Sequence, residues 1–309
     1  MTKSLHVVIA GGSGMIGRAL TTELFALGHN VTVLTRSPST RVQRARPVVW
    51  NPEAGQLDLD ALGEVDAIVN LAGHSLSIMP WTLARKRRIL SSRVDATTTI
   101  VDAIARASRK PTVLVNGSAV GFYGNRGNEA LSESSPAGSG FLAHVVQEWE
   151  QAAAAVDPSV RLVIARTGIV IAAEGALTPL RRLAQFSLAG PIGNGRQWWP
   201  WISLRDEVKA LIFAIMNRSA SGVMNFVGPN PATARDVVRA LARRVHRLYW
   251  FPAPGFMLRL FLGDAAKEML LSSQKVVPTH LIASGFIFDD DTIDHAIVRA
   301  LRDADRRAI

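Results

Sequence analysis

The stretch Leu5–Gly17, which reads LHVVIAGGSGMIG, decides the fold of this 309-residue chain. Its first six residues form an apolar run rich in β-branched side chains, which predicts a buried strand. Glycines then follow at positions 11, 14 and 17, where a helix opens. The first allows a tight turn, the second lets the backbone approach a phosphate, and the third lets the helix pack closely on the strand. The stretch therefore predicts a strand, a turn and a helix that bind a dinucleotide.

The rest of the N-terminal half alternates strands with amphipathic helices. The predicted strands are Leu5–Ala10, Val31–Thr35, Val48–Trp50, Asp66–Leu71, Thr112–Gly117 and Arg161–Arg166, and the predicted helices are Met15–Leu27, Thr82–Ala107 and Gly140–Val156. This alternation predicts an α/β fold of the Rossmann type, with a doubly wound parallel sheet. After Ala173 the sequence changes to glycine, proline and tryptophan. We therefore expect a cofactor domain at residues 1–173 and a smaller substrate-side lobe at residues 174–309.

Composition excludes several chemistries. The chain has no cysteine, so disulfides, zinc–thiolate sites, iron–sulfur clusters and a cysteine nucleophile are excluded, and we expect no metal. No apolar run reaches the roughly 18 residues of a membrane span, because Arg166 and Glu174 interrupt the best candidate. The N-terminal apolar run ends in glycines and not in a cleavage site. We expect a cytoplasmic protein with no membrane partner.

The formal charge of +10 is nearly all arginine. Its densest runs, at residues 85–88 and 235–247, are interleaved with apolar residues at helical spacing. This pattern predicts solvated faces of amphipathic helices, and no nucleic-acid-binding motif accompanies it. We expect no specific nucleic acid as a partner.

Arg36 indicates which dinucleotide binds. It follows the second predicted strand, where an acidic residue would hold the ribose hydroxyls of NAD. A guanidinium at this place pairs instead with the 2′-phosphate of NADP, with Thr35 and Arg41 as helpers. The alternative is a solvated loop arginine in an arginine-rich chain. We predict NADP(H) as the cofactor.

Two further strands end in small residues, in the loops Asn70–Gly73 and Asn116–Ala119, which would let a cofactor lie close. Ser118 in the second loop has a side chain able to donate a hydrogen bond to a substrate carbonyl, or else to serve a turn. Three tryptophans, at positions 198, 199 and 201, either line a substrate pocket or pack between the two parts of the chain.

At this point a family resemblance becomes visible, and it extends over nearly the whole chain. The chain resembles the extended short-chain dehydrogenase/reductases, in the branch of epimerase family proteins that are similar to nucleoside-diphosphate-sugar epimerases and carry a C-terminal domain of unknown function. The matching stretches include Ala10–Gly17, Thr35–Arg36, Asp66–Gly73, Ser118–Gly124, Trp149–Glu150, Arg166–Val170, Gly190–Ile202 and Gln274–Pro278. For this branch the resemblance implies an NADP-binding Rossmann fold.

The cofactor residues that we predict combine the motifs with this resemblance. They are Gly11, Gly12, Ser13, Gly14, Met15, Ile16, Gly17, Thr35, Arg36, Leu71, Ala72, Gly73, Arg93, Ser118 and Ile169. From the residues alone, Arg93 either reaches a phosphate or caps its helix.

The chain departs from the wider superfamily at its catalytic pair, Tyr-x-x-x-Lys. In that pair the tyrosine transfers the substrate proton, while the lysine lowers the pKa of the tyrosine and holds the ribose. Extended members carry a glutamate four residues beyond the lysine. If Glu150 is that glutamate, Val146 and Leu142 replace the lysine and the tyrosine. No other register restores the pair, because no lysine occurs between Lys110 and Lys209.

Three residues are our candidates for the chemistry: Ser118, Tyr123 and His144. Tyr123 is near Ser118 in sequence, and His144 lies on the helix of the missing pair. Each has a structural alternative, Tyr123 as a packed loop aromatic and His144 as a surface residue. His74, after the Asn70–Gly73 loop, is a weaker candidate.

Two functions from different classes remain open. One is an NADP(H)-dependent oxidoreductase or epimerase acting on an unidentified carbonyl or alcohol, with a sugar-like compound as one option. The other is a non-catalytic NADP(H)-binding regulator or sensor. In either case we expect a small-molecule ligand and a monomer or homodimer.

Overall fold

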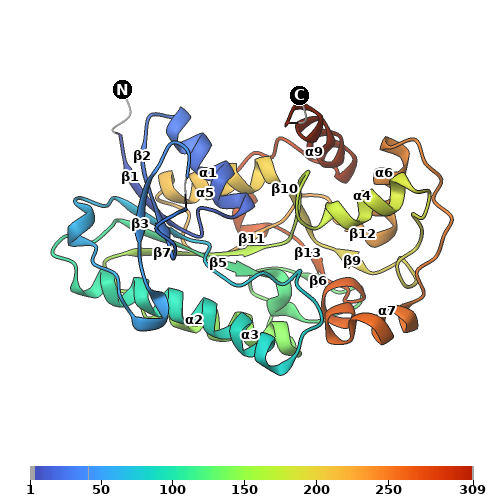
Figure 1. The fold of residues 1–309 in the computed structure, drawn as a ribbon, viewed down its shortest axis with the longest axis horizontal. Coiled ribbons are helices and arrows are strands. Elements are labelled where there is room, and N and C mark those ends of the chain that lie inside the picture. Colours follow the sequence, from blue (N-terminus) through green and yellow to red (C-terminus); the bar gives the residue numbers. More distant parts are fainter. Residues whose placement is uncertain (1–3, 41, 308–309) are drawn as a thin grey trace.

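The central sheet has seven parallel strands in the order β11-β7-β5-β4-β1-β2-β3. It is seen in a computed structural model that describes residues 4–40 and 42–307 (Figure 1). Arg41 lies outside the described residues. The strands are β1 (His6–Ala10), β2 (Asn30–Thr35), β3 (Arg46–Val49), β4 (Ala67–Asn70), β5 (Val113–Ala119), β7 (Arg161–Thr167) and β11 (Gly222–Phe226).

Helices cover both faces of this sheet. On one face lie α1 (Met15–Ala26) and α5 (Leu204–Met216), and on the other lie α2 (Leu83–Arg106) and α3 (Phe141–Ala154) (Figure 1). Side chains alternate in direction along β1, so this strand contributes to the hydrophobic cores on both faces of the sheet. Val7 and Ile9 join the core under α1 and α5, whereas Val8 and Ala10 join the core under α2. The predicted doubly wound α/β fold is confirmed.

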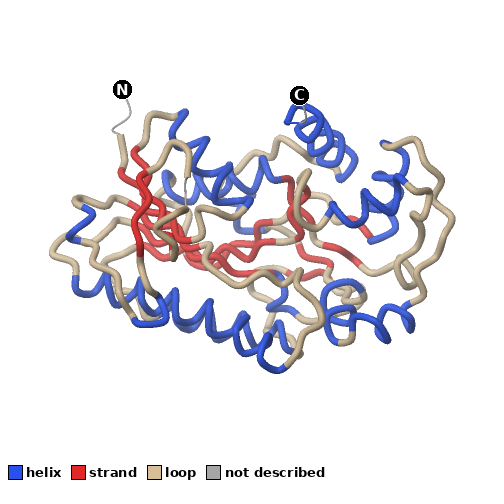
Figure 2. The backbone as a smooth tube through the Cα atoms, viewed as in Figure 1, coloured by secondary structure: helices blue, strands red, loops and turns tan. Residues whose placement is uncertain are grey.

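A lobe of short elements stands at the carboxyl end of the strands, and Figure 2 shows that loops and helices dominate it. Its strands are β6 (Ala130–Leu131), β8 (Ile169–Ile171), β9 (Trp198–Trp199), β10 (Trp201–Ser203), β12 (Ala232–Thr233) and β13 (Lys275–Val276). Its helices are α4 (Leu177–Gln185), α6 (Ala234–Arg244), α7 (Gly255–Leu262), α8 (Thr279–Ala283) and α9 (Ile293–Arg307). Single helical turns are η1 (Pro52–Ala54), η2 (Asp60–Leu62), η3 (Val120–Tyr123) and η4 (Ala266–Leu270).

The lobe has its own hydrophobic core, centred on Trp199, Trp201 and Leu241. These two tryptophans are therefore packing residues. Trp198, between them and the sheet, is half-buried and donates from Nε1 to Asn128 Oδ1 at 2.7 Å. The packing alternative is confirmed for Trp199 and Trp201, and a role for Trp198 in a substrate pocket stays a prediction.

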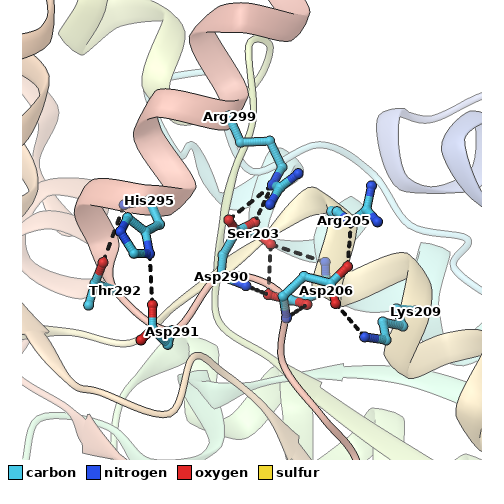
Figure 3. Close-up of polar contacts among 10 residues, drawn as sticks. Ser203, Arg205, Asp206, Lys209, Asp290, Asp291, Thr292, His295 and Arg299 are labelled. Carbon is cyan, nitrogen blue, oxygen red and sulfur yellow. Dashed lines mark hydrogen bonds and ion pairs between the residues drawn. The ribbon is translucent and has the colours of Figure 1, made fainter.

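Asp206 ties the C-terminal segment to the sheet. Its carboxylate is fully buried at the start of α5 and accepts hydrogen bonds from Ser203 Oγ and from the backbone amides of Asp289 and Asp290. Arg299 on α9 then donates from Nε to both oxygens of the Asp290 carboxylate, at 2.9 Å to Oδ1 and 2.8 Å to Oδ2 (Figure 3). Loss of the Asp206 carboxylate would leave the Ser203 hydroxyl and two backbone amides without an acceptor. This cluster therefore holds α9 beside the start of α5.

The two arginine-rich runs form the amphipathic helices expected of them. Ile89 on α2 and Val237, Val238 and Leu241 on α6 are buried, whereas Arg87 and Arg243 are exposed. Across the described residues, none of the helices has the length and apolar character needed to cross a bilayer.

Candidate functional site

The glycine-rich turn between β1 and α1 has the geometry that a phosphate site requires. Gly11 adopts φ +80°, and a methyl group added to it would lie 2.5 Å from the Leu71 carbonyl oxygen. A methyl on Gly17 would lie 2.5 Å from the carbonyl oxygen of Gly11. Helix α1 begins at Gly14 without a side-chain cap, so its first amides remain available to an anion.

A cavity of about 320 Å³ opens beside this turn, at the carboxyl edge of the sheet. Of the predicted cofactor residues, those that line it are Gly11, Ser13, Gly14, Thr35, Arg36, Leu71, Ala72 and Gly73. Beyond them the lining includes Trp50, Glu53 and Asp95. Three separate loops after β1, β2 and β4 therefore meet around one space, as the sequence predicts.

The remaining predicted cofactor residues lie outside this lining. Gly12 packs against Val33 beneath the turn, and a methyl group on it would lie 2.6 Å from that side chain. Ile169 begins β8 and donates its amide to the Pro200 carbonyl at 2.7 Å. The others are Met15, Ile16, Gly17, Arg93 and Ser118.

Arginines lie near the His74 side of the cavity, and the acids Glu53 and Asp95 line it as well. The pKa of His74, on its rim, is lowered first by burial and then by the charges of Arg88, Arg85, Arg36 and Arg93. A proton on His74 is disfavoured because the potential there is already positive, and the same potential favours an anion.

Arg93 lies next to this cavity with its guanidinium partly engaged. It donates to the carbonyl oxygens of Ile89 and His74 at 2.9 and 3.2 Å and stacks over the Trp149 ring at 5.3 Å. Burial lowers its pKa to about 10. A methyl group on Gly73 would lie 3.0 Å from the guanidinium carbon, so Arg93 forms the wall behind the cavity loop.

Leu142 and Val146 occupy the predicted positions of the missing tyrosine and lysine. A methyl group added to Gly121 would lie 3.3 Å from Leu142 Cβ and 3.8 Å from Val146 Cγ2. Helix α3 therefore presents an apolar face to η3 at this level. Neither side chain can carry a proton.

Ser118, in β5, contacts Glu150, which lies one helical turn beyond Val146 on α3. Its hydroxyl donates to Glu150 Oε1 at 2.5 Å, and Glu150 in turn accepts from Arg166 Nε and Nη2 at 2.8 Å each. Arg166 is buried within β7, with 4% of its side chain exposed. An ion pair this deep needs such complete pairing, because an uncompensated buried charge is costly.

Tyr123 extends the same network away from the cavity. It has no exposed surface, and its hydroxyl accepts from Arg166 Nη1 at 3.0 Å and donates to Asn225 Oδ1 at 2.7 Å. Burial raises the pKa of this phenol, against the lowering effect of Arg166. Asn225 Nδ2 continues to the Val277 carbonyl, so the network joins β7 to the C-terminal segment.

His144 lies on the outer face of α3. Its side chain is 60% exposed, and Nδ1 lies 3.9 Å from Glu148 Oε1. The three catalytic candidates therefore do not share one site. Ser118 is hydrogen-bonded to Glu150, Tyr123 is buried and bonded to Arg166 and Asn225, and His144 is exposed to solvent.

A second cavity of about 670 Å³ lies between the lobe and the loop after η3. Its polar lining consists of Asn125, Asn128, Asn194, Arg196, Gln197, Trp198, Arg259 and Ser273. Gln197 is buried, and among the described residues its Oε1 has no hydrogen-bond partner. Residues 125–128 were not singled out from the sequence, because they carry no motif.

Across the described residues, no group of three or more histidine, aspartate or glutamate side chains is arranged to hold a metal ion. The fold and the glycine turn are those of an extended short-chain dehydrogenase/reductase, and the Tyr-x-x-x-Lys pair of that class is absent from α3.

Family models agree with this class. The model of the NAD dependent epimerase/dehydratase family matches residues 7–228, and a domain of unknown function, DUF1731, matches residues 253–300. The chain belongs to the NAD dependent epimerase/dehydratase family.

Individual relatives cover almost the whole chain. Epimerase family protein ML0860 of Mycobacterium leprae is 42% identical over 294 residues, which cover 94% of each protein. The crystal structure of human epimerase family protein SDR39U1 with NADPH has a TM-score of 0.89 at 30% identity, covering 96% of this chain and 99% of that one. A nucleoside-diphosphate sugar epimerase from Corynebacterium glutamicum has a TM-score of 0.75 at 28% identity, covering 99% of this chain and 67% of that one.

Proposed function

We propose that this protein binds NADP(H) in the cavity beside the glycine turn and works as an oxidoreductase or epimerase on a small carbonyl or alcohol. The observation that carries the proposal is the meeting of three loops, after β1, β2 and β4, around one cavity that has Arg36 in its lining. When bound, the cofactor supplies or accepts a hydride.

The residues present fit the dinucleotide. The uncapped amides at the start of α1 face an anion, and the glycine turn has no side chain that would block a pyrophosphate. Arg36 is exposed in the same cavity, where it pairs with a 2′-phosphate. NADPH in the human relative agrees with this choice.

We place the substrate in the second cavity. The segment that lines it from Asn125 follows directly from η3 and β5, so the cavity stands at the same carboxyl edge of the sheet. Its asparagines and Gln197 offer hydrogen bonds to hydroxyl groups, while Arg196 and Arg259 favour an anionic substituent. This lining fits a sugar-like compound that carries a negative group.

The chain's own part in the chemistry is to position the cofactor and the substrate. Since Leu142 and Val146 are apolar and Tyr123 is sealed, we assign no proton transfer to the positions of the Tyr-x-x-x-Lys pair. Tyr123 instead holds Arg166, and through it Glu150 and Ser118. The proton comes from water or from the substrate itself, so turnover is slower by the roughly 10²–10⁴-fold that general acid–base catalysis contributes.

The test has two parts. Dissociation constants for NADPH and NADH, measured by quenching of protein fluorescence, establish the cofactor. Oxidation of NADPH at 340 nm, followed against a panel of phosphorylated and carboxylated carbonyl compounds, establishes the reaction. Tight NADPH binding with turnover that persists in Tyr123→Phe supports the proposal, and failure to bind either cofactor overturns it.

A second function, a non-catalytic NADP(H) sensor, is favoured by one observation. The apolar Leu142 and Val146 stand where the superfamily has its proton donor and ribose ligand. Under this proposal NADPH binds without any turnover, and it protects the chain against proteolysis. Catalysis at ordinary enzyme rates excludes the sensor.

A monomer or homodimer in the cytoplasm, where NADP(H) is available, remains part of the proposal.

A further inference from the structure

Helix α7 turns an apolar face to solvent. Its sequence is GFMLRLFL, and none of its eight residues is buried. The side chains of Phe256, Met257, Leu260 and Phe261 are 72%, 43%, 77% and 71% exposed. These four stand at i and i+4 in two adjacent rows, so they form one continuous face. Leu258, on the opposite side of the helix, packs against the lobe core and fixes that orientation.

Exposed apolar side chains also occur in the segment that precedes α7. Leu248, Trp250 and Phe251 are 70%, 61% and 48% exposed. This segment runs beside residues 188–192, through bridges from Ala189 to Tyr249 and from Ile192 to Ala253. Seven large apolar side chains are therefore exposed between residues 248 and 261, and we call residues 248–261 the apolar end of the lobe. Exposed patches of this kind mark interaction sites.

Arginines outnumber acidic residues near the apolar end, where Asp264 pairs with Lys86 and Asp294 pairs with Arg243. No aspartate or glutamate occurs from residue 237 to residue 263, whereas arginine occurs at positions 239, 243, 244, 247 and 259. Arg244, Arg247 and Arg259 are exposed, and Arg259 is the one charged residue of α7 itself. An apolar helix face with tryptophan, phenylalanine and leucine beside arginines has the composition of a helix that lies in a membrane interface.

We propose that the apolar end of the lobe docks on an anionic lipid surface, with α7 lying parallel to it. An eight-residue helix is about 12 Å long, so it inserts its apolar face among the acyl chains while the arginines stay with the headgroups. The expectation of no membrane partner rested on spanning segments, and this proposal concerns binding at the membrane surface instead. The proposal is independent of what the cofactor cavity does.

A second copy of this chain fits the surface less well. In a symmetric dimer the same patch meets itself, so Arg247 and Arg259 of one copy would approach the arginines of the other, while the nearby carboxylates of Asp264 and Asp294 are already paired with Lys86 and Arg243. An anionic bilayer supplies both the apolar interior and the negative charge that the patch lacks.

The test is binding to lipid vesicles, read through Trp250. Of the tryptophans, Trp50, Trp81, Trp149, Trp199 and Trp201 are buried and Trp198 is half-buried, so Trp250 alone is largely exposed. The full-length protein is mixed with phosphatidylcholine vesicles containing about one-third phosphatidylglycerol, with or without brominated acyl chains, and with pure phosphatidylcholine vesicles. We expect co-sedimentation and bromine quenching with the anionic vesicles, weakened by salt because the headgroup attraction is screened.

Variants separate the apolar from the electrostatic part. Phe256→Ser with Leu260→Ser should weaken partitioning by more than about 100-fold, because two large side chains lose their burial in lipid. Arg259→Gln should weaken it about fivefold. Ile287→Ser is the matched control, since Ile287 is 75% exposed on the segment next to α5 and should not affect binding.

The outcomes that overturn the proposal are distinct from failure to fold, which circular dichroism of each variant detects. Absence of binding to anionic vesicles at low salt overturns it, and so does equal binding to pure phosphatidylcholine. A dimer in size-exclusion chromatography that Phe256→Ser disrupts, without any vesicle binding, overturns it in favour of a second copy.

Discussion

Glu207 gives the sharpest physical prediction. It lies on α5 beneath the end of β7 and has no exposed surface. Thr167 Oγ1 donates to Glu207 Oε1 at 2.9 Å, while Oε2 is buried and has no partner among the described residues. Burial raises its pKa from 4.5 to about 8, partly offset by Thr167. The carboxyl is therefore neutral in the folded protein at pH 7.

The sign of the pH dependence follows from linkage. An acid whose pKa is higher in the folded than in the unfolded chain stabilises the fold fully below the unfolded value, and that stability is lost as the pH rises toward the folded value. The gap from 4.5 to about 8 corresponds to almost 5 kcal/mol, at about 1.4 kcal/mol per pH unit. About 3.5 kcal/mol of this is lost between about pH 5 and about pH 8.

Glu207→Gln should remove this loss. Glutamine keeps the shape of the side chain and an oxygen that accepts from Thr167, but it does not ionise. We expect the unfolding free energy of the variant, relative to the unmodified protein, to rise by about 3 kcal/mol or more from about pH 5 to about pH 8.

Urea unfolding at several pH values, followed by circular dichroism, measures this difference. Glu23→Gln, at an exposed position on α1, is the control and should show no such trend. Parallel stability curves for Glu207→Gln and the unmodified protein would refute the reasoning, because they would mean that Glu207 is ionised in the fold.

Three further predictions concern the cofactor, the polar network and the C-terminal anchor. Arg36→Asp should lower the affinity for NADPH about 10–100-fold and remove the preference for NADPH over NADH. The control Arg46→Asp, at an exposed position, should not change either affinity. Equal affinities for the two cofactors in the unmodified protein would contradict the assignment of Arg36 to the 2′-phosphate. Tyr123→Phe should cost about 1–3 kcal/mol of unfolding free energy, because it unpairs Asn225 Oδ1, and should leave NADPH affinity unchanged in a fluorescence titration. Asp206→Asn should speed limited proteolysis between residues 228 and 253, and an unchanged digestion pattern would show that the anchor is dispensable.

The sequence predicts the first 170 residues well, for a physical reason. Most of the central strands there are buried runs rich in β-branched residues, and the helices follow Gly, Ser or Thr start signals. The predicted strand at Val31–Thr35 lies within β2, and the predicted helix at Thr82–Ala107 contains α2. Strand β11, however, reads GVMNF, too short and too mixed to separate from a loop, and its place in the sheet depends on tertiary contact with β7.

Some features of the candidate site could likewise be predicted from the sequence, and others could not. Backbone-determined features, such as the glycine turn and the loop at Leu71, follow from local sequence. The burial and hydrogen bonding of Tyr123 do not follow from local sequence, because they depend on Arg166 and Asn225, which lie far from it in the chain. One signal was available: Arg166 interrupts an apolar strand, and a buried guanidinium requires a carboxylate partner, which the structure supplies as Glu150.

Strand β11 also constrains how the protein is made. The chain leaves the sheet after β7 and returns only at Gly222, once residues 168–221 have been built. On the ribosome, six strands can pair early, while β7 remains an open edge until that return. An unpaired apolar edge is a template for aggregation. The interval between the synthesis of β7 and that of β11 is therefore the stage at which the nascent chain most needs a chaperone.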